Sequence, residues 1–98
     1  MRQGAVHQVN GAGVRAIVVS SDIYNDTTKH ALAVPLLRRG AGPEGYTVTL
    51  GEQDNFTGTA DVFDIDRVPV TAFGPEEGLI SGASLSALLD AVRGLFDM

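Results

Sequence analysis

Residues 14–25, which read VRAIVVSSDIYN, are the stretch of this sequence that decides the fold. The centre, Ala16–Val19, is a continuous apolar run, as in a strand that is buried on both faces. Ser21 and Asp22 follow at once, and such residues favour helix caps and turns. The stretch therefore predicts a buried strand and then a short helix or turn. We expect Ser21, Asp22 and Asn25 to cap and turn the backbone rather than to react.

Glycines and prolines divide the flanking sequence into further short strands. The predicted strands are Ala5–Val9, Val14–Ser20, Ala31–Leu37, Tyr46–Leu50 and Thr59–Ile65, followed by a short piece at Val68–Ala72. A tight connection through Gly11, Ala12 and Gly13 joins the first two strands. Pro69 lacks an N–H group, which indicates an edge or a strand start for the last piece.

The last segment has helical rather than strand periodicity. Its apolar residues recur at the spacing of one helix face and are Leu85, Leu88, Leu89, Val92, Leu95 and Phe96. Ser84 is the predicted N-cap. The whole pattern predicts one domain, 1–98, of the mainly β (α+β) class. We expect about five short strands, with a C-terminal amphipathic helix laid on the sheet that they form.

Composition limits the classes of function. The 98 residues contain no cysteine, which excludes disulfides, thiolate catalysis and cysteine metal sites. We expect a cytoplasmic protein, because the N-terminus lacks an apolar signal region and no run is long enough to span a membrane. A chain this small has a modest core, and a homodimer is the natural way to enlarge it.

The charge is unevenly distributed. Seven Lys and Arg against twelve Asp and Glu give 7 − 12 = −5, but residues 1–42 carry 5 − 2 = +3 and residues 43–98 carry 2 − 10 = −8. This balance argues against a protein that coats nucleic acid over its whole surface. A small local basic site in the first half remains compatible with it.

Three stretches in this order resemble the MazF/PemK/Kid superfamily of bacterial toxins. They are residues 14–25, then Ala33-Val34-Pro35-Leu36-Leu37, then Val68-Pro69-Val70-Thr71. The same residues resemble CcdB, which shares that fold, through Ser21-Asp22-Ile23 and through Val68-Pro69-Val70 followed by Gly74-Pro75-Glu76-Glu77. The resemblance implies the toxin of a type II toxin–antitoxin module, dimeric and with a cognate antitoxin as partner. It also implies the fold, a five-stranded twisted antiparallel sheet or small SH3-like barrel with a C-terminal amphipathic helix.

The MazF resemblance implies a metal-independent endoribonuclease that cleaves single-stranded mRNA. Arg15 matches the family's arginine at the start of the second strand, so it is the first candidate to hold the phosphate or the charge of the transition state. The family's threonine falls on Leu37, and its first-strand acid falls on Ala5. The alternative for Arg15 is an ordinary surface ion pair with one of the many acids.

Arg38, Arg39 and Lys29 are candidate RNA-binding residues, with solvated turn positions as the alternative reading of the two arginines. His7 is a weaker catalytic candidate, because an imidazole exchanges protons near neutral pH, although a lone strand histidine is more often simply half-buried. Asp64 is a second weak candidate, together with Arg67, since Kid-like toxins place an aspartate and an arginine on the corresponding strand.

We expect no metal and no cofactor. The two histidines lack zinc spacing, and on one strand Asp61 would point away from Asp64 and Asp66, which favours a solvated strand edge. Two other functions stay open. One is a DNA gyrase poison that acts through Phe96, Asp97 and Met98, in place of the terminal residues of CcdB. The other is a degenerate toxin that only binds an antitoxin.

Overall fold

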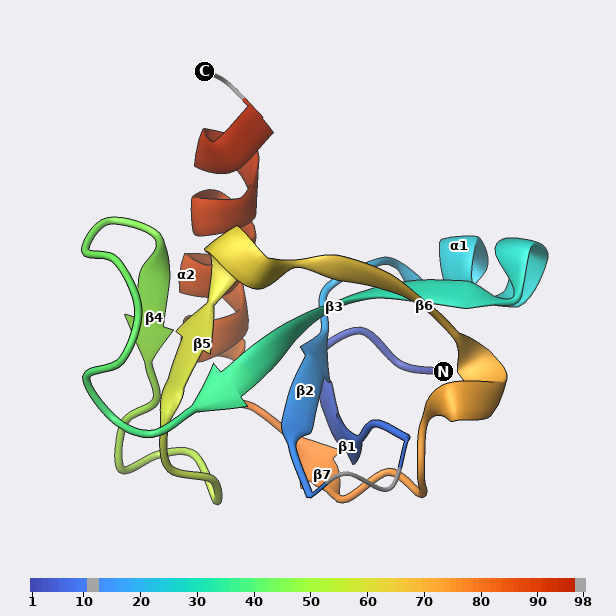
Figure 1. Ribbon diagram of the computed structural model, residues 1–98, viewed down its shortest axis with the longest axis horizontal. Coiled ribbons are helices and arrows are strands. Elements are labelled where there is room, and N and C mark those ends of the chain that lie inside the picture. The colour runs from blue at the N-terminus through green and yellow to red at the C-terminus, as the bar shows by residue number, and fades with distance from the viewer. Residues whose placement is uncertain (11–12, 97–98) are drawn as a thin grey trace.

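The strand β3 (His30–Leu37) organises the sheet, because it pairs with three other strands. The computed structural model describes residues 1–10 and 13–96. The other strands are β1 (Ala5–Gln8), β2 (Arg15–Val18), β4 (Thr47–Thr49), β5 (Thr59–Asp61), β6 (Asp66–Pro69) and β7 (Gly78–Leu79). All pairings are antiparallel, in the order β4-β5-β3-β2-β1-β7, with β6 also on β3 (Figure 1). The expected antiparallel sheet with a C-terminal helix is confirmed, and the described residues form seven strands instead of five.

The predicted strand Thr59–Ile65 is wrong in its second half. β5 ends at Asp61, and the 3₁₀ helix η1 (Val62–Asp64) turns the chain before β6 begins. The reason is local, since the Asp61 carboxylate accepts a hydrogen bond from the N–H of Phe63 at 3.0 Å and caps the turn. Both strands still lie on one edge of β3, so the turn divides a strand into two without changing the topology. A second 3₁₀ helix, η2 (Val70–Ala72), ends the predicted Val68–Ala72 piece.

The stretch that follows the buried run of β2 forms α1 (Asp22–Thr28), as predicted. The Ser21 hydroxyl caps the helix by accepting the N–H of Tyr24 at 3.2 Å. Lys29 ends it in the left-handed conformation at φ 58°. β2 and β3, which α1 connects, then pair as neighbours with Ile17 opposite Val34.

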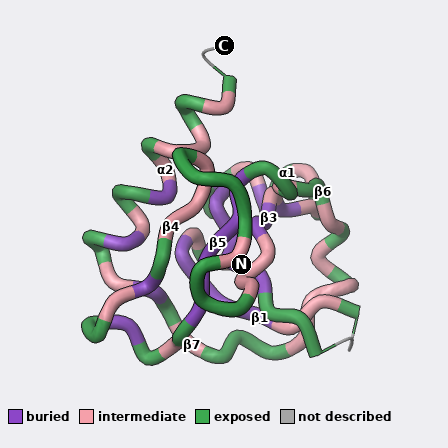
Figure 2. Tube along the Cα trace, turned by 60° about the vertical axis from the view of Figure 1, so that its left-hand side comes forward, coloured by how far each residue is buried: buried purple, intermediate pink, exposed green. Residues whose placement is uncertain are grey.

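The core lies between the sheet and α2 (Gly82–Phe96), which stands behind β4 and β5 (Figure 1). Buried positions gather on the inner strands and recur along α2 (Figure 2). Leu88 is fully buried, and Leu85, Leu89, Val92 and Leu95 pack against the core, as the periodicity predicted. Phe96 does not complete this face, because its side chain is 70% exposed where the helix runs past the sheet.

Ser84 is not the N-cap of α2. The helix begins two residues earlier, and the hydroxyl of Ser81 accepts the N–H of Ser84 at 3.1 Å. Ser84 is buried and donates its own hydroxyl to the Asp54 carboxylate at 2.7 Å. The prediction of Ser84 as the cap was wrong because its hydroxyl is bound by Asp54, which lies 30 residues away in the sequence.

Gly58 allows β5 to approach the end of β3. Its φ is +134°, and a Cβ at this position would lie 2.4 Å from the carbonyl oxygen of Leu37. Both features oppose any L side chain. We therefore expect Gly58→Ala to lower the free energy of unfolding by about 2 kcal/mol, measured by urea denaturation. Gly45→Ala is the matched control for φ alone, since its φ is +88° but nothing lies near its Cβ. Equal losses in the two variants would show that the close approach contributes nothing.

None of the helices within residues 1–10 and 13–96 has the length and apolar character needed to cross a membrane.

Candidate functional site

A cavity of about 360 Å³ lies where β1 meets the segment that leads into β7. It is lined by Gln8, Gly74, Pro75 and Glu77. The backbone holds this wall in place, because the N–H of Gly74 donates to the carbonyl of Gln8 and the N–H of Glu77 donates to that of Val6, both at 2.8 Å. Its volume falls within the range of small-ligand pockets.

Arg15 and Glu77 form an ion pair beside this cavity. Arg15 is the first residue of β2 and stands opposite Gln8 on β1, while Glu77 directly precedes β7 on the other edge of β1. The Arg15 side chain reaches across β1, and its Nε donates to Oε1 of Glu77 at 2.7 Å. Within the described part of the chain, the terminal guanidinium nitrogens of Arg15 and Oε2 of Glu77 have no partner. The pair therefore presents both donors and an acceptor.

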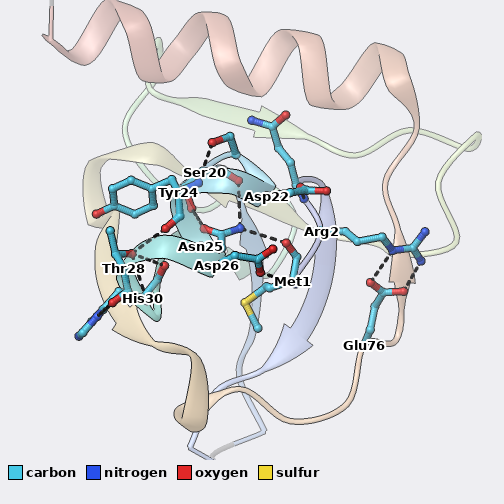
Figure 3. Close-up of polar contacts among 12 residues, drawn as sticks. Met1, Arg2, Ser20, Asp22, Tyr24, Asn25, Asp26, Thr28, His30 and Glu76 are labelled. Carbon is cyan, nitrogen blue, oxygen red and sulfur yellow. Dashed lines mark hydrogen bonds and ion pairs between the residues drawn. The ribbon is translucent and has the colours of Figure 1, made fainter.

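A second ion pair fixes the same segment from the other side. Arg2 binds Glu76 through two hydrogen bonds, one of them from Nε to Oε1 at 3.0 Å (Figure 3). The hydrogen bonds from Arg2 lower the pKa of the Glu76 carboxyl. The adjacent acids Glu76 and Glu77 thus hold two arginines from different parts of the chain, which fixes the position of Glu77.

His7 lies next to this wall but does not line the cavity. Its ring is buried, packs edge-on against Phe73, and places Nδ1 2.8 Å from the carbonyl oxygen of Gly74. A carbonyl only accepts, so Nδ1 donates to Gly74, and Nε2 is buried and without a partner among the described residues. His7 therefore supports Gly74 through Nδ1, and its ring is buried rather than half-buried.

The structure brings two of the three basic candidates to the Arg15 end of the sheet. Arg15 pairs with Leu36 near the end of β3, and Arg38 and Arg39 follow two and three residues later, both exposed. Lys29 precedes the opposite end of β3, beside α1 (Figure 1). Seven strand residues at about 3.3 Å each put it roughly 20 Å away. Lys29 is therefore not part of this site.

Asp64 also lies elsewhere. It lines a second cavity of about 190 Å³ together with Asp66, over a patch of apolar residues that includes Ala16 and Pro35. Since neighbouring residues of a strand point to opposite faces, Ala16 marks the face opposite to that of Arg15. Arg67 is exposed on β6, and its Nε donates to the hydroxyl of Tyr24 at 3.3 Å.

Asp61 differs from the solvated strand edge that the sequence indicated, because it is 4% exposed and caps η1. Among the residues that the structure describes, no group of three or more His, Asp or Glu side chains could hold a metal ion.

The polar residues after β2 form hydrogen bonds that hold the local backbone in place. Asn25 is buried and bonds Ser20 and the carbonyl of Met1, while Asp22 accepts the N–H of Gln3 at 2.8 Å (Figure 3). These contacts fasten α1 to the N-terminal segment. Of the residues considered for a gyrase contact, Phe96 is exposed at the end of α2, and Asp97 and Met98 lie outside the described residues.

Glu77 and Gln8 belong to the site and were not singled out by the sequence. The only signal for Glu77 was the acidic pair in Gly74-Pro75-Glu76-Glu77, which also fits a solvated turn. Glu77 contacts Arg15 only because β1 pairs with both β2 and β7, which brings together two residues that are 62 positions apart in the sequence.

Comparisons with known proteins show which solved structures share this fold. No family model matches the chain, and no curated protein matches it. Among solved structures, an endoribonuclease from a mycobacterial species is similar with a TM-score of 0.90 and 20% identity, covering 100% of this chain and 92% of the other. A mycobacterial endoribonuclease in complex with its cognate antitoxin has a TM-score of 0.89, 21% identity and coverage of 100% and 96%. The MazE–MazF complex from Deinococcus radiodurans is similar with a TM-score of 0.85 and 19% identity, covering 100% of this chain and 97% of the other. The chain has the fold of these proteins over its whole length.

Proposed function

We propose that this chain is the toxin of a type II toxin–antitoxin module and cleaves single-stranded mRNA without a metal ion. The observation that carries the proposal is Arg15, which lies beside a cavity on a fold that matches endoribonucleases from end to end. A guanidinium holds phosphate oxygens with two parallel hydrogen bonds, and its charge stabilises the phosphorane that forms during cleavage.

The reaction that fits these groups uses the RNA's own 2′-hydroxyl. Its oxygen attacks the adjacent phosphorus, the bond to the 5′-oxygen breaks, and the products end in a 2′,3′-cyclic phosphate and a 5′-hydroxyl. Arg15 acts as the clamp on the phosphate. Arg38 and Arg39 extend the basic track from the same end of the sheet and bind neighbouring phosphates.

The partners in this proposal are a cognate antitoxin and a second copy of the chain. One of the similar structures is an endoribonuclease bound to its antitoxin, which supports the first. A disordered acidic segment that covers Arg15, Arg38 and Arg39 would compete directly with RNA.

The test is to incubate the purified chain with long mixed-sequence mRNA in excess EDTA and to identify the ends of the products. We expect defined cuts, cyclic phosphate and 5′-hydroxyl ends, and no cleavage of single-stranded DNA of the same sequence. Expression in cells provides the contrast. Linearised plasmid from trapped gyrase with intact RNA would instead favour a gyrase poison that uses exposed Phe96, and normal growth with intact RNA would favour a degenerate toxin.

A further inference from the structure

We infer that Glu77 is the general base of this reaction and removes the proton of the 2′-hydroxyl while Arg15 holds the phosphate. The inference rests on the proposed endoribonuclease function and adds the group that the clamp cannot supply. Arginine stays protonated in proteins and cannot accept a proton. An acceptor must therefore lie beside it, within hydrogen-bond reach of the sugar next to the bound phosphate.

The neighbouring titratable groups do not meet this requirement. His7 is buried, has its Nδ1 committed to Gly74 and lines neither cavity. Asp64 lines the cavity on the opposite face of the sheet. Glu76 is held by Arg2 through both carboxylate oxygens. Glu77 alone among the described acids touches Arg15 and lines the cavity beside it.

The geometry of Glu77 suits the role. Oε1 accepts the Arg15 bond, which leaves Oε2 to face a substrate. The N–H of Glu77 is bonded to Val6 and the next residue enters β7, so the backbone beneath the carboxylate is fixed. Its side chain is 28% exposed, which keeps it accessible to a sugar hydroxyl. Positions 5 and 37, where the resembling toxins carry an acid and a threonine, are Ala5 and Leu37 here, and neither can exchange a proton.

The step balances with water as the only co-reactant. Glu77 takes the 2′-hydroxyl proton as the 2′-oxygen bonds to phosphorus. The bond from phosphorus to the 5′-oxygen breaks, and that oxygen takes a proton from water. The protonated Glu77 carboxyl then returns its proton to the solvent.

The test compares Glu77→Gln with the wild type in single-turnover cleavage of the mRNA used above. We expect the rate to fall by about 10²- to 10³-fold at neutral pH. The wild-type rate should change little between about pH 6 and about pH 8, whereas the variant should speed up by about tenfold per pH unit, since hydroxide must then remove the proton. Glu77→Asp, which keeps a carboxylate, should recover part of the rate and the flat profile.

Asp90→Asn is the matched control, because it neutralises an exposed acid on α2 that does not line the cavity, and it should keep nearly full activity. Binding of single-stranded DNA, which has no 2′-hydroxyl, should be at least as tight in Glu77→Gln as in the wild type, since a negative charge is removed.

Two results would overturn the inference alone, provided that the wild type cleaves RNA. One is a Glu77→Gln rate within about threefold of the wild type with the same pH profile. The other is a faster rate, which would mean that Glu77 only blocks Arg15. A wild type that leaves RNA intact overturns the proposed function itself, so the two failures are distinguishable.

Discussion

Replacing Arg15 with alanine is expected to lower the rate of RNA cleavage by about 10³-fold, because it removes the cation that faces the phosphorane. Substrate positioning should suffer as well, since the terminal guanidinium nitrogens are free to hold the phosphate. The measurement is single-turnover cleavage of mRNA in EDTA. In cells, the same variant should no longer arrest growth.

The fold should survive this substitution. The ion pair with Glu77 lies at the surface, with the two side chains 48% and 28% exposed, and such pairs contribute at most about 1 kcal/mol. Urea denaturation should therefore give nearly the wild-type free energy of unfolding, so the loss of cleavage reports on chemistry.

Two further variants sharpen the interpretation. Arg15→Lys keeps a positive charge but loses the planar fork, so it should recover only part of the rate. Arg93→Ala is the matched control, since it removes another arginine that binds an acid, Asp90, on the exposed face of α2. An Arg15→Ala protein that cuts RNA at the wild-type rate would remove this residue from the site.

Asp54→Ala is expected to cause the largest loss of stability, about 3 to 4 kcal/mol in the free energy of unfolding. The carboxylate is buried and accepts three hydrogen bonds, from the N–H of Ser81 at 2.6 Å, the hydroxyl of Ser84 at 2.7 Å and the N–H of Gly51 at 3.2 Å. It thereby joins the loop before β5 to the first turn of α2. Without it, the buried Ser84 hydroxyl and two N–H groups lose their acceptor.

The contribution of Asp54 should depend on pH in a defined direction. Burial is the largest single influence on the pKa of Asp54 and raises it. The donors from Ser81, Ser84 and Gly51 together outweigh burial, so the pKa lies below the ordinary value of 3.8. A lowered folded-state pKa means that the stabilisation is fully present above 3.8 and disappears as the pH falls through the folded-state value.

Urea denaturation of the wild type and Asp54→Ala over a series of pH values measures this directly. We expect a constant difference between the two proteins above about pH 5 and a shrinking difference below the ordinary value. Asp90→Ala is the control, because Asp90 is an exposed helix acid whose side chain is 71% accessible and whose loss should cost about 0.5 kcal/mol or less. A difference that does not depend on pH would contradict the role of the ionised Asp54 carboxylate.

The sequence by itself determined the buried strand β2, the short helix or turn that follows it and the apolar face of α2. These features depend on neighbours within a few residues. The continuous run in Ala16–Val19 requires burial on both faces, Ser21 caps the helix beside it, and a helical repeat selects the packing residues from Leu85 to Leu95. Arg15 became the first site candidate through the resemblance of residues 14–25, and this role stays a prediction.

Only the tertiary structure decided which residues accompany Arg15. His7 and Asp64 were catalytic candidates from the sequence, but they lie in other surroundings, one in a buried contact with Gly74 and the other on the opposite face. Lys29 was separated from Arg38 by the full length of β3. No local sequence pattern shows which residues lie next to Arg15, because strand register and strand order determine this.

The charge division shows the same limit. The first half of the chain carries the basic excess, and the sequence suggested an open phosphate face. In the folded protein, Arg2 and Arg15 each bind an acid from the second half, at Glu76 and Glu77. Opposite charges that are distant in sequence attract once the sheet brings them together. Folding therefore places two of the arginines in ion pairs instead of leaving them on an open basic surface. The tertiary structure thereby added Glu77 to the site.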